Sequence, residues 1–130
     1  MKKVFLGGTC NDSTWRDALI PLLKIDYFNP VVDDWTIETQ IEELLQREVC
    51  DYCLYVITPR MEGFYSIAEV VDDSNKRPEK TLFCYLASDD GETFGAVQLK
   101  SLEAIRKMIK KNKAIVCTSL QEIADYLNAS

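Results

Sequence analysis

Residues 50–71 constrain the fold most, because they indicate a buried strand, a turn and a helix in direct succession. Residues 52–57 form an unbroken aromatic and aliphatic run, which is typical of a strand covered on both faces. A turn containing proline and glycine ends this run before a helical pattern begins at Phe64. Ligands of open α/β sheets bind beyond the carboxyl ends of the strands. The stretch therefore predicts an α/β fold and places Glu69 near a binding crevice.

Further apolar runs alternate with helical patterns along the rest of the chain. We expect the other strands at residues 3–6, 25–30, 81–86 and 114–117, and the other helices near residues 15–23, 36–49, 99–109 and 119–127. The acidic, glycine-containing segment 87–96 is predicted to be a mobile loop. Five strands and five helices in 130 residues predict a single domain, residues 1–130, with a doubly wound five-stranded parallel sheet of flavodoxin-like type and strand order 2-1-3-4-5. In that order the loops at residues 7–13 and 58–66 converge on one crevice.

Composition narrows the classes of function. The net charge of −6 and the pI near 4.7 argue against binding of a nucleic-acid polymer, which needs a basic surface, and favour a small molecule. The sequence contains no histidine, so the commonest general base and the commonest zinc ligand are both missing, and we expect neither a metal nor a cofactor. No apolar run is long enough to span a bilayer, and the chain enters a strand pattern at once, so we expect no membrane partner and a cytoplasmic location.

The five cysteines are predicted to be reduced core thiols, since most lie in or beside strand-like runs. Cys50 and Cys53 have the C-x-x-C spacing of redox proteins, but they lead into a strand and not into a helix N-terminus, where the helix dipole would lower a thiol pKa. Packing is therefore the favoured role. Asp51, at the start of the same strand, is predicted to be structural.

Three features point to the predicted crevice: the Gly7-Gly8-Thr9 segment, the Asp33-Asp34-Trp35 segment after the second strand, and Glu69. A carboxylate beside aromatic and hydroxyl groups suits glycosyl chemistry, because a carboxylate nucleophile traps an oxocarbenium-like centre while a second acid protonates the leaving group. Trp35, Phe64 and Tyr65 offer flat surfaces for a nucleobase.

Each of these features also has a purely structural interpretation. The two glycines suit a loop that holds an anion or a sugar hydroxyl, and equally a tight β–α turn. Trp35 and Tyr65 suit half-buried packing as well as ligand stacking. Capping-box spacing, in which an acidic residue follows a hydroxyl residue by three positions, occurs at three predicted helix starts: Thr14 with Asp17, Ser66 with Glu69, and Ser119 with Glu122. A capping role for Glu69 therefore stays open beside a catalytic one.

Several short motifs in order resemble those of the nucleoside 2-deoxyribosyltransferase-like proteins, and the resemblance runs from about residue 3 to residue 86. They are Val4-Phe5-Leu6-Gly7-Gly8-Thr9, Trp15-Arg16, Gln40-Ile41-Glu42-Glu43, Cys50-Asp51 and Ser66-Ile67-Ala68-Glu69. The resemblance implies a flavodoxin-like homo-oligomer, at least a homodimer, that cleaves the N-glycosidic bond of a deoxynucleoside or deoxynucleotide. It also implies that the neighbouring subunit can complete the pocket, for which residues 87–96 are the candidate.

The resemblance further implies roles for individual residues. Glu69 matches the nucleophile that forms a glycosyl-enzyme, from which a second base or water takes the sugar. Glu43 matches an acidic residue that contacts the sugar, where close members often have aspartate. The transferases carry an aspartate shortly before the nucleophile that helps to protonate the base. Here Glu62 is the candidate substitute for it, and Arg60 in the same turn is either a phosphate contact or an ordinary solvated arginine.

The predicted site thus has Glu69 as the catalytic residue. The predicted substrate-binding residues are Gly7, Gly8, Thr9, Asp34, Trp35, Glu43, Glu62, Tyr65 and Ser66. The competing class is a nucleotide-binding or structural flavodoxin-like protein without turnover.

Overall fold

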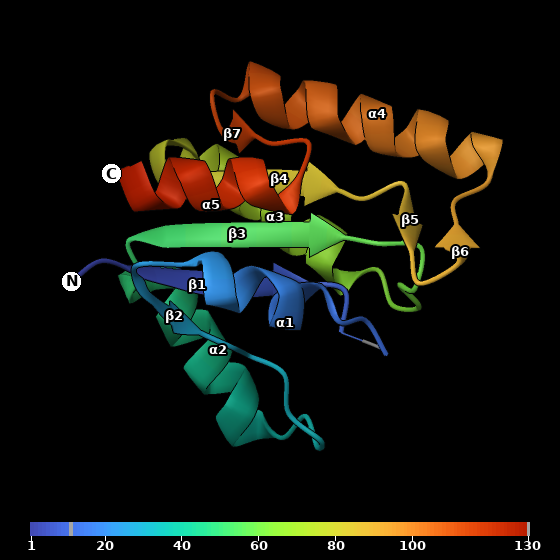
Figure 1. Cartoon of the computed structure of the whole chain (residues 1–130). Coiled ribbons are helices and arrows are strands. Elements are labelled where there is room, and N and C mark those ends of the chain that lie inside the picture. The colour runs from blue at the N-terminus through green and yellow to red at the C-terminus, as the bar shows by residue number, and fades with distance from the viewer. Residues whose placement is uncertain (11, 130) are drawn as a thin grey trace.

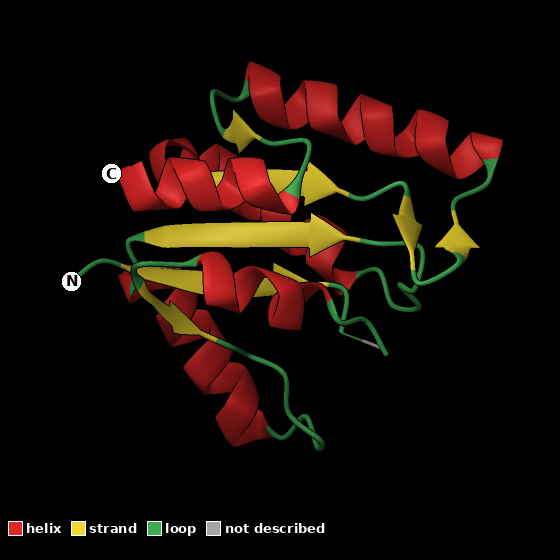
Figure 2. Ribbon diagram, in the orientation of Figure 1, coloured by secondary structure: helices red, strands yellow, loops and turns green. Residues whose placement is uncertain are grey.

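The computed structural model describes residues 1–10 and 12–129 and has a five-stranded, all-parallel sheet at its centre (Figures 1 and 2). The sheet order is β2-β1-β3-β4-β7, which is the predicted order 2-1-3-4-5 when only the sheet strands are numbered. Its strands are β1 (Lys3–Gly8), β2 (Asp26–Phe28), β3 (Tyr52–Ile57), β4 (Thr81–Tyr85) and β7 (Ile115–Val116). The predicted single-domain α/β fold is therefore confirmed.

Helices cover both faces of the sheet (Figure 1). On one face, α1 (Trp15–Leu19) and α5 (Leu120–Ala129) pack against alternate residues of β1, β3 and β4. On the other face, α3 (Tyr65–Lys76) and α4 (Ala96–Lys111) cover the remaining residues of those strands. Short 3₁₀ turns, Ile20–Leu22 and Pro78–Lys80, lead toward β2 and β4. All six residues of β3 are buried, as its uninterrupted apolar pattern predicts.

Helix α2 (Ile37–Val49) lies at the edge of the molecule and turns its apolar stripe outward (Figure 1). Its exposed apolar residues retain 48% to 73% of their surface; they are Ile37, Ile41, Leu44, Leu45 and Val49. Arg47 is the residue of this helix that is buried. A charged side chain, Arg47, thus occupies the inward face of α2.

Two local predictions are wrong. Thr14 precedes α1 but makes no side-chain capping bond, because its ψ of 15° departs from the extended conformation usual at this position. Segment 87–96, predicted to be a mobile loop, contains the antiparallel strands β5 (Ser88–Asp89) and β6 (Glu92–Thr93). Their turn places Asp90 and Gly91 at φ of 48° and 85°, the left-handed pair that a two-residue hairpin requires.

The hairpin is joined to the loops that follow β1 and β3. The hydroxyl of Ser13 donates a hydrogen bond to Asp89 Oδ2 at 2.6 Å, and Arg60 Nη2 donates to the carbonyl oxygen of Asp90 at 3.1 Å. These contacts position the hairpin beside the carboxyl end of the sheet.

Other predictions concern single residues. Asp51 is structural, since its Oδ2 accepts a hydrogen bond from the backbone N–H of Lys3 at 2.8 Å. All five cysteines are free thiols; four are buried, and Cys10 corrects the expectation of a core thiol because it is exposed. Ser119 caps α5 as expected, with its hydroxyl accepting from the backbone N–H of Glu122 at 3.1 Å. Within the described ranges, no helix has the length and hydropathy needed to cross a membrane.

Candidate active site

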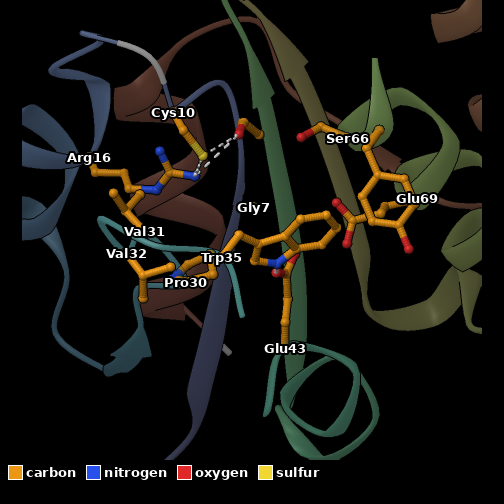
Figure 3. A pocket seen from close by; sticks show the side chains of 12 residues that line it. Gly7, Cys10, Arg16, Pro30, Val31, Val32, Trp35, Glu43, Ser66 and Glu69 are labelled. Atoms are coloured by element: carbon orange, nitrogen blue, oxygen red, sulfur yellow. Dashed lines mark hydrogen bonds between the residues drawn. The ribbon is translucent and has the colours of Figure 1, made fainter. Parts of the chain in front are cut away.

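A cavity of about 280 Å³ opens at the carboxyl ends of β1 and β3 (Figure 3). The loops after these two strands meet there, as the sheet order predicts. The walls also come from the loop after β2 and from α2 and α3. The lining residues are Gly7, Gly8, Cys10, Arg16, Pro30, Val31, Val32, Trp35, Glu43, Tyr65, Ser66 and Glu69.

Glu69 lies on the first turns of α3 and lines this cavity, although only 5% of its surface is exposed. The capping-box interpretation is wrong, because Phe64 is the N-cap of α3 and no side chain caps the helix. Ser66 is instead a helical residue that lines the cavity beside Glu69 (Figure 3). Among the described residues, Glu69 Oε2 has no hydrogen-bond partner. Glu69 thus lines the cavity while its Oε2 is buried and lacks a hydrogen bond.

The surroundings of Glu69 favour its protonated form. Burial, followed by the neighbouring Glu43 carboxylate, raises the pKa of Glu69 to about 8. The Arg47 guanidinium opposes this rise. With the cavity empty, Glu69 is therefore mostly protonated at neutral pH. A pKa moved this far, in a cavity, is typical of residues with a chemical role.

Behind Glu69 lies a buried ionic cluster that the sequence analysis missed. Arg47 Nη1 is 3.6 Å from Glu69 Oε2, while Arg47 Nε and Nη2 donate to the two Asp73 oxygens at 3.2 and 2.9 Å. Asp73 also accepts from the Tyr55 hydroxyl and, at 2.9 Å, from Arg77 Nε. Asp73 and Tyr55 have no exposed surface.

One signal in the sequence points to part of this cluster. Asp73 follows Glu69 by four residues and so shares its helix face. An inward Glu69 therefore implies an inward Asp73. Burial alone would raise the pKa of Asp73, but the hydrogen bonds from Arg47 and Tyr55 hold that pKa below its usual value.

Trp35 and Tyr65 stand at the mouth of the cavity. Their ring centroids are 5.9 Å apart with a tilt of 55°, and they keep 57% and 51% of their surface exposed. The indole Nε1 of Trp35 donates to Glu43 Oε2 at 3.2 Å, which links the loop after β2 to α2. Two aromatic faces and two carboxylates, Glu43 and Glu69, thus line one cavity (Figure 3).

The glycine segment lines the cavity and also meets strict packing demands. A Cβ on Gly7 would lie 2.6 Å from the Tyr55 ring. Gly8 has a φ of 118°, in the left-handed region that favours glycine. Both glycines belong to the end of β1 and not to a turn, and the structure requires glycine at both positions whether or not a ligand also contacts them.

Arg16 is a second buried arginine that the sequence analysis did not assign to the site. Its guanidinium donates to the carbonyl oxygens of Leu6 at 2.9 Å, Thr9 at 2.7 Å and Gly8 at 3.4 Å. It also lies over the Trp15 ring, 4.4 Å from the centroid. Arg16 therefore holds the backbone of the glycine segment in place.

The remaining predicted residues lie away from the main cavity. Thr9 and Glu62 line a smaller neighbouring cavity of about 140 Å³, and the Thr9 hydroxyl accepts from the backbone N–H of Thr58 at 3.0 Å. Asp34 is exposed and lines neither cavity. Arg60, which contacts the hairpin, also lines neither of them.

Comparison with known proteins identifies the family. The family model described as "Nucleoside 2-deoxyribosyltransferase like" matches residues 1–88, which is more than half of the chain and carries β1, β3, α3 and all twelve residues that line the main cavity. A search of the curated proteins found no match. On the strength of the family match, this chain belongs to the nucleoside 2-deoxyribosyltransferase-like family.

Proposed function

We propose that this protein is an enzyme that cleaves or transfers at the N-glycosidic bond of a (deoxy)nucleoside or nucleotide through a glycosyl-Glu69 intermediate. The observation that carries the proposal is the Glu69 side chain, which is only 5% exposed and yet lines the cavity, with no hydrogen bond to its buried Oε2 among the described residues. Family membership supports the class of substrate. The chemistry needs no histidine, and this chain has none.

The reaction has two displacements. The ionised Glu69 attacks the anomeric carbon, a C–O ester bond forms, and the electron pair of the broken C–N bond moves to the base. The base takes a proton from solvent, or from Glu62 where the base reaches the smaller cavity that Glu62 lines. Water or a second base then attacks the anomeric carbon, breaks the ester and regenerates the Glu69 carboxylate. In hydrolysis, water also supplies the proton released into solution.

The lining of the cavity suggests where the substrate would lie. Trp35 and Tyr65 provide aromatic faces for the base. Glu43 would accept a hydrogen bond from a sugar hydroxyl; it lines the cavity, and its Oε2 also accepts from Trp35 Nε1 at 3.2 Å. Gly7, Gly8 and Ser66 complete the wall beside Glu69.

We also propose a homodimer that works in the cytoplasm. The exposed apolar stripe of α2 supports self-association, since a contiguous patch of this kind usually marks an interface. Five free cysteines fit a reducing compartment.

The direct test compares the wild-type chain with Glu69→Gln. Release of free base would be followed over a panel of deoxynucleosides, ribonucleosides and their 5′-monophosphates, with and without a second base. We expect release by the wild-type chain and a loss of at least about 10³-fold in Glu69→Gln. Glu38→Gln, the same change at an exposed position of α2, is the matched control and should keep full activity.

Two results would count against the proposal. If the wild-type chain binds a nucleotide by calorimetry but releases no base, a non-catalytic nucleotide-binding protein becomes the better description. If Glu69→Gln keeps its activity, Glu69 is not the nucleophile.

A further inference from the structure

We propose that Arg47 and Asp73 form a positioning pair, in which Asp73 holds the Arg47 guanidinium at a set distance from Glu69. This inference rests on the proposed function, because it concerns how the same nucleophile is kept ready for attack. Arg47 and Asp73 are positioning residues and not catalytic residues, since Glu69 separates them from the cavity that would hold the substrate.

The distances carry the argument. Arg47 forms ion pairs with three carboxylates and binds them unequally, with closest approaches of 2.9 Å to Asp73, 3.2 Å to Asp72 and 3.6 Å to Glu69. The contact with Asp73 uses two donors, Nε and Nη2, while Nη1 faces Glu69. Arg47 therefore supplies a positive charge near Glu69 without the short, paired hydrogen bonds that a bidentate partner would make.

This difference has a chemical consequence. A carboxylate that shares both oxygens with a guanidinium loses lone-pair availability and must break strong bonds in order to attack carbon. A guanidinium 3.6 Å away still favours the ionised form, yet it leaves Oε2 unbonded. Arg47 in this position thus partly offsets the burial and the Glu43 charge that favour protonation of Glu69, and it leaves the ionised carboxylate free to attack.

Asp73 can hold Arg47 because it is itself firmly anchored. It accepts from the Tyr55 hydroxyl on β3 and from Arg77 Nε at the end of α3, and it has no exposed surface. Removing one partner from such a buried group is costly, since the remaining charge is left without compensation. The ionic cluster thus fixes α2 against β3 and α3 and sets where Arg47 can lie.

Several other titratable groups surround Glu69 and enter any account of its pH dependence. Glu43 on α2 raises the pKa of Glu69, and Asp73 does so more weakly. Asp72 on α3 binds Arg47 Nη2 at 3.2 Å from a partly exposed position. Tyr55 on β3 stays neutral, because burial raises its pKa well above the usual range. The Cys53 thiol donates to the carbonyl oxygen of Arg47, and burial raises its pKa to about 12, so it also stays neutral.

The test uses two substitutions with opposite expected effects. Arg47→Met removes the charge near Glu69 and should raise the pKa of Glu69 by about one unit or more. Asp73→Asn frees Arg47 to pair closely with Glu69 and should lower that pKa. The pKa would be measured on the ligand-free protein by NMR of ¹³C-labelled glutamate, with the Glu69 signal identified by its loss in Glu69→Gln. This readout does not depend on the proposed activity.

Activity gives the second readout. In Asp73→Asn, we expect the plateau kcat at high pH to fall about tenfold or more, even though more Glu69 is ionised at neutral pH. If Asp73 acted only by repelling the negative charge of Glu69, Asp73→Asn would release base faster than the wild type at neutral pH. A faster Asp73→Asn therefore overturns the proposal. Arg106→Gln, which removes a cation that pairs with Glu103 on α4 outside the ionic cluster, is the control and should move the Glu69 pKa by less than about half a unit.

Arg47→Lys serves where Arg47→Met fails to fold. Lysine keeps the charge but has one donor nitrogen and cannot make the two-nitrogen contact with Asp73, so we expect a Glu69 pKa near that of the wild type with a lower kcat. If Glu69 titrates identically in the wild type, Arg47→Met and Asp73→Asn, the positioning role is wrong. If the expected pKa changes occur in a protein that releases no base from any substrate, the positioning role stands and the proposed function fails.

Discussion

The backbone of Gly8 runs so close to that of Val56 that a Cβ on Gly8 would lie 2.1 Å from the Val56 carbonyl oxygen. Gly8 also has a φ of 118°, which L side chains rarely adopt. We therefore expect Gly8→Ala to lower the free energy of unfolding by about 3 kcal/mol or more, because it separates β1 from β3 at the floor of the cavity. Urea denaturation followed by circular dichroism measures this change.

Gly63→Ala is the matched control for that substitution. A Cβ at Gly63 would have no atom within 4 Å. Its free energy of unfolding should stay within about 1 kcal/mol of the wild type. Equal stabilities of the Gly8 and Gly63 variants would contradict the close contact between the two strands.

The activity of the wild-type chain should depend on the ionisation of Glu69. Because burial and Glu43 raise the pKa of Glu69 to about 8, the nucleophile is mostly protonated at pH 6. We expect kcat/KM to rise roughly tenfold per pH unit up to about pH 8 and then to level off. Initial rates of base release across this range measure the profile. A flat profile between pH 6 and pH 9 would rule out Glu69 as a nucleophile with a raised pKa.

The same carboxyl should make stability fall as pH rises. Between the ordinary pKa of 4.5 and the folded value of about 8, the folded state keeps a proton that the unfolded state has lost. The contribution of Glu69 to the free energy of unfolding is therefore lost as the pH rises through that range. Glu69→Gln has no titrating group at this position. The free energy of unfolding of the variant minus that of the wild type should therefore be on the order of 3 kcal/mol larger at pH 9 than at pH 5. Urea titrations at both pH values measure it, and Glu38→Gln should show no such trend.

The proposed self-association through α2 is tested by charge. Ile41→Glu together with Leu45→Glu places two carboxylates on the exposed apolar stripe. We expect sedimentation equilibrium to give twice the 14.9 kDa chain mass for the wild type and the single-chain mass for the double variant. Val97→Glu, at an exposed apolar position of α4, should leave the mass unchanged. A wild-type chain that sediments as a monomer would contradict the dimer.

The fluorescence of Trp35 can report ligand binding directly. The chain has two tryptophans, and Trp15 is buried while Trp35 lies at the mouth of the cavity. If a base stacks on Trp35, titration with a nucleoside should quench the tryptophan fluorescence. Trp35→Phe should lose the quenching but keep an aromatic face. Equal quenching in Trp35→Phe would place the ligand elsewhere.

The sheet and the location of Glu69 could be predicted because local patterns determine them. The buried run of β3 and the chirality of parallel crossovers restrict the strand order, and that order brings the loops after β1 and β3 together. The hairpin was missed because each of its strands has only two residues, too few for a periodic pattern. The predicted cap by Thr14 is wrong because side-chain capping depends on the backbone angle ψ, which cannot be read from residue spacing.

Arg47 was missed for a different reason. Its partners Asp72 and Asp73 lie 25 and 26 residues away in the sequence, and an arginine on an amphipathic helix ordinarily faces solvent. The direction of the apolar stripe of α2 is equally hard to predict. Periodicity identifies an apolar face of a helix, but it does not say whether that face packs against the same chain. Here the inward face is the one that carries Arg47 and Glu43.

Helix α2 therefore has two different faces: the inner face carries Arg47 and Glu43, and the outer face carries the exposed apolar stripe. Shifting its register by a single residue would turn the helix by about 100°, and would withdraw Arg47 and Glu43 while burying the stripe. Insertions and deletions within residues 37–49 should consequently be tolerated far less than their distance from Glu69 along the chain suggests. We expect a change of length to be tolerated better in the loop before α2. Trp35 of this loop is bound to Glu43 of α2 by its own hydrogen bond.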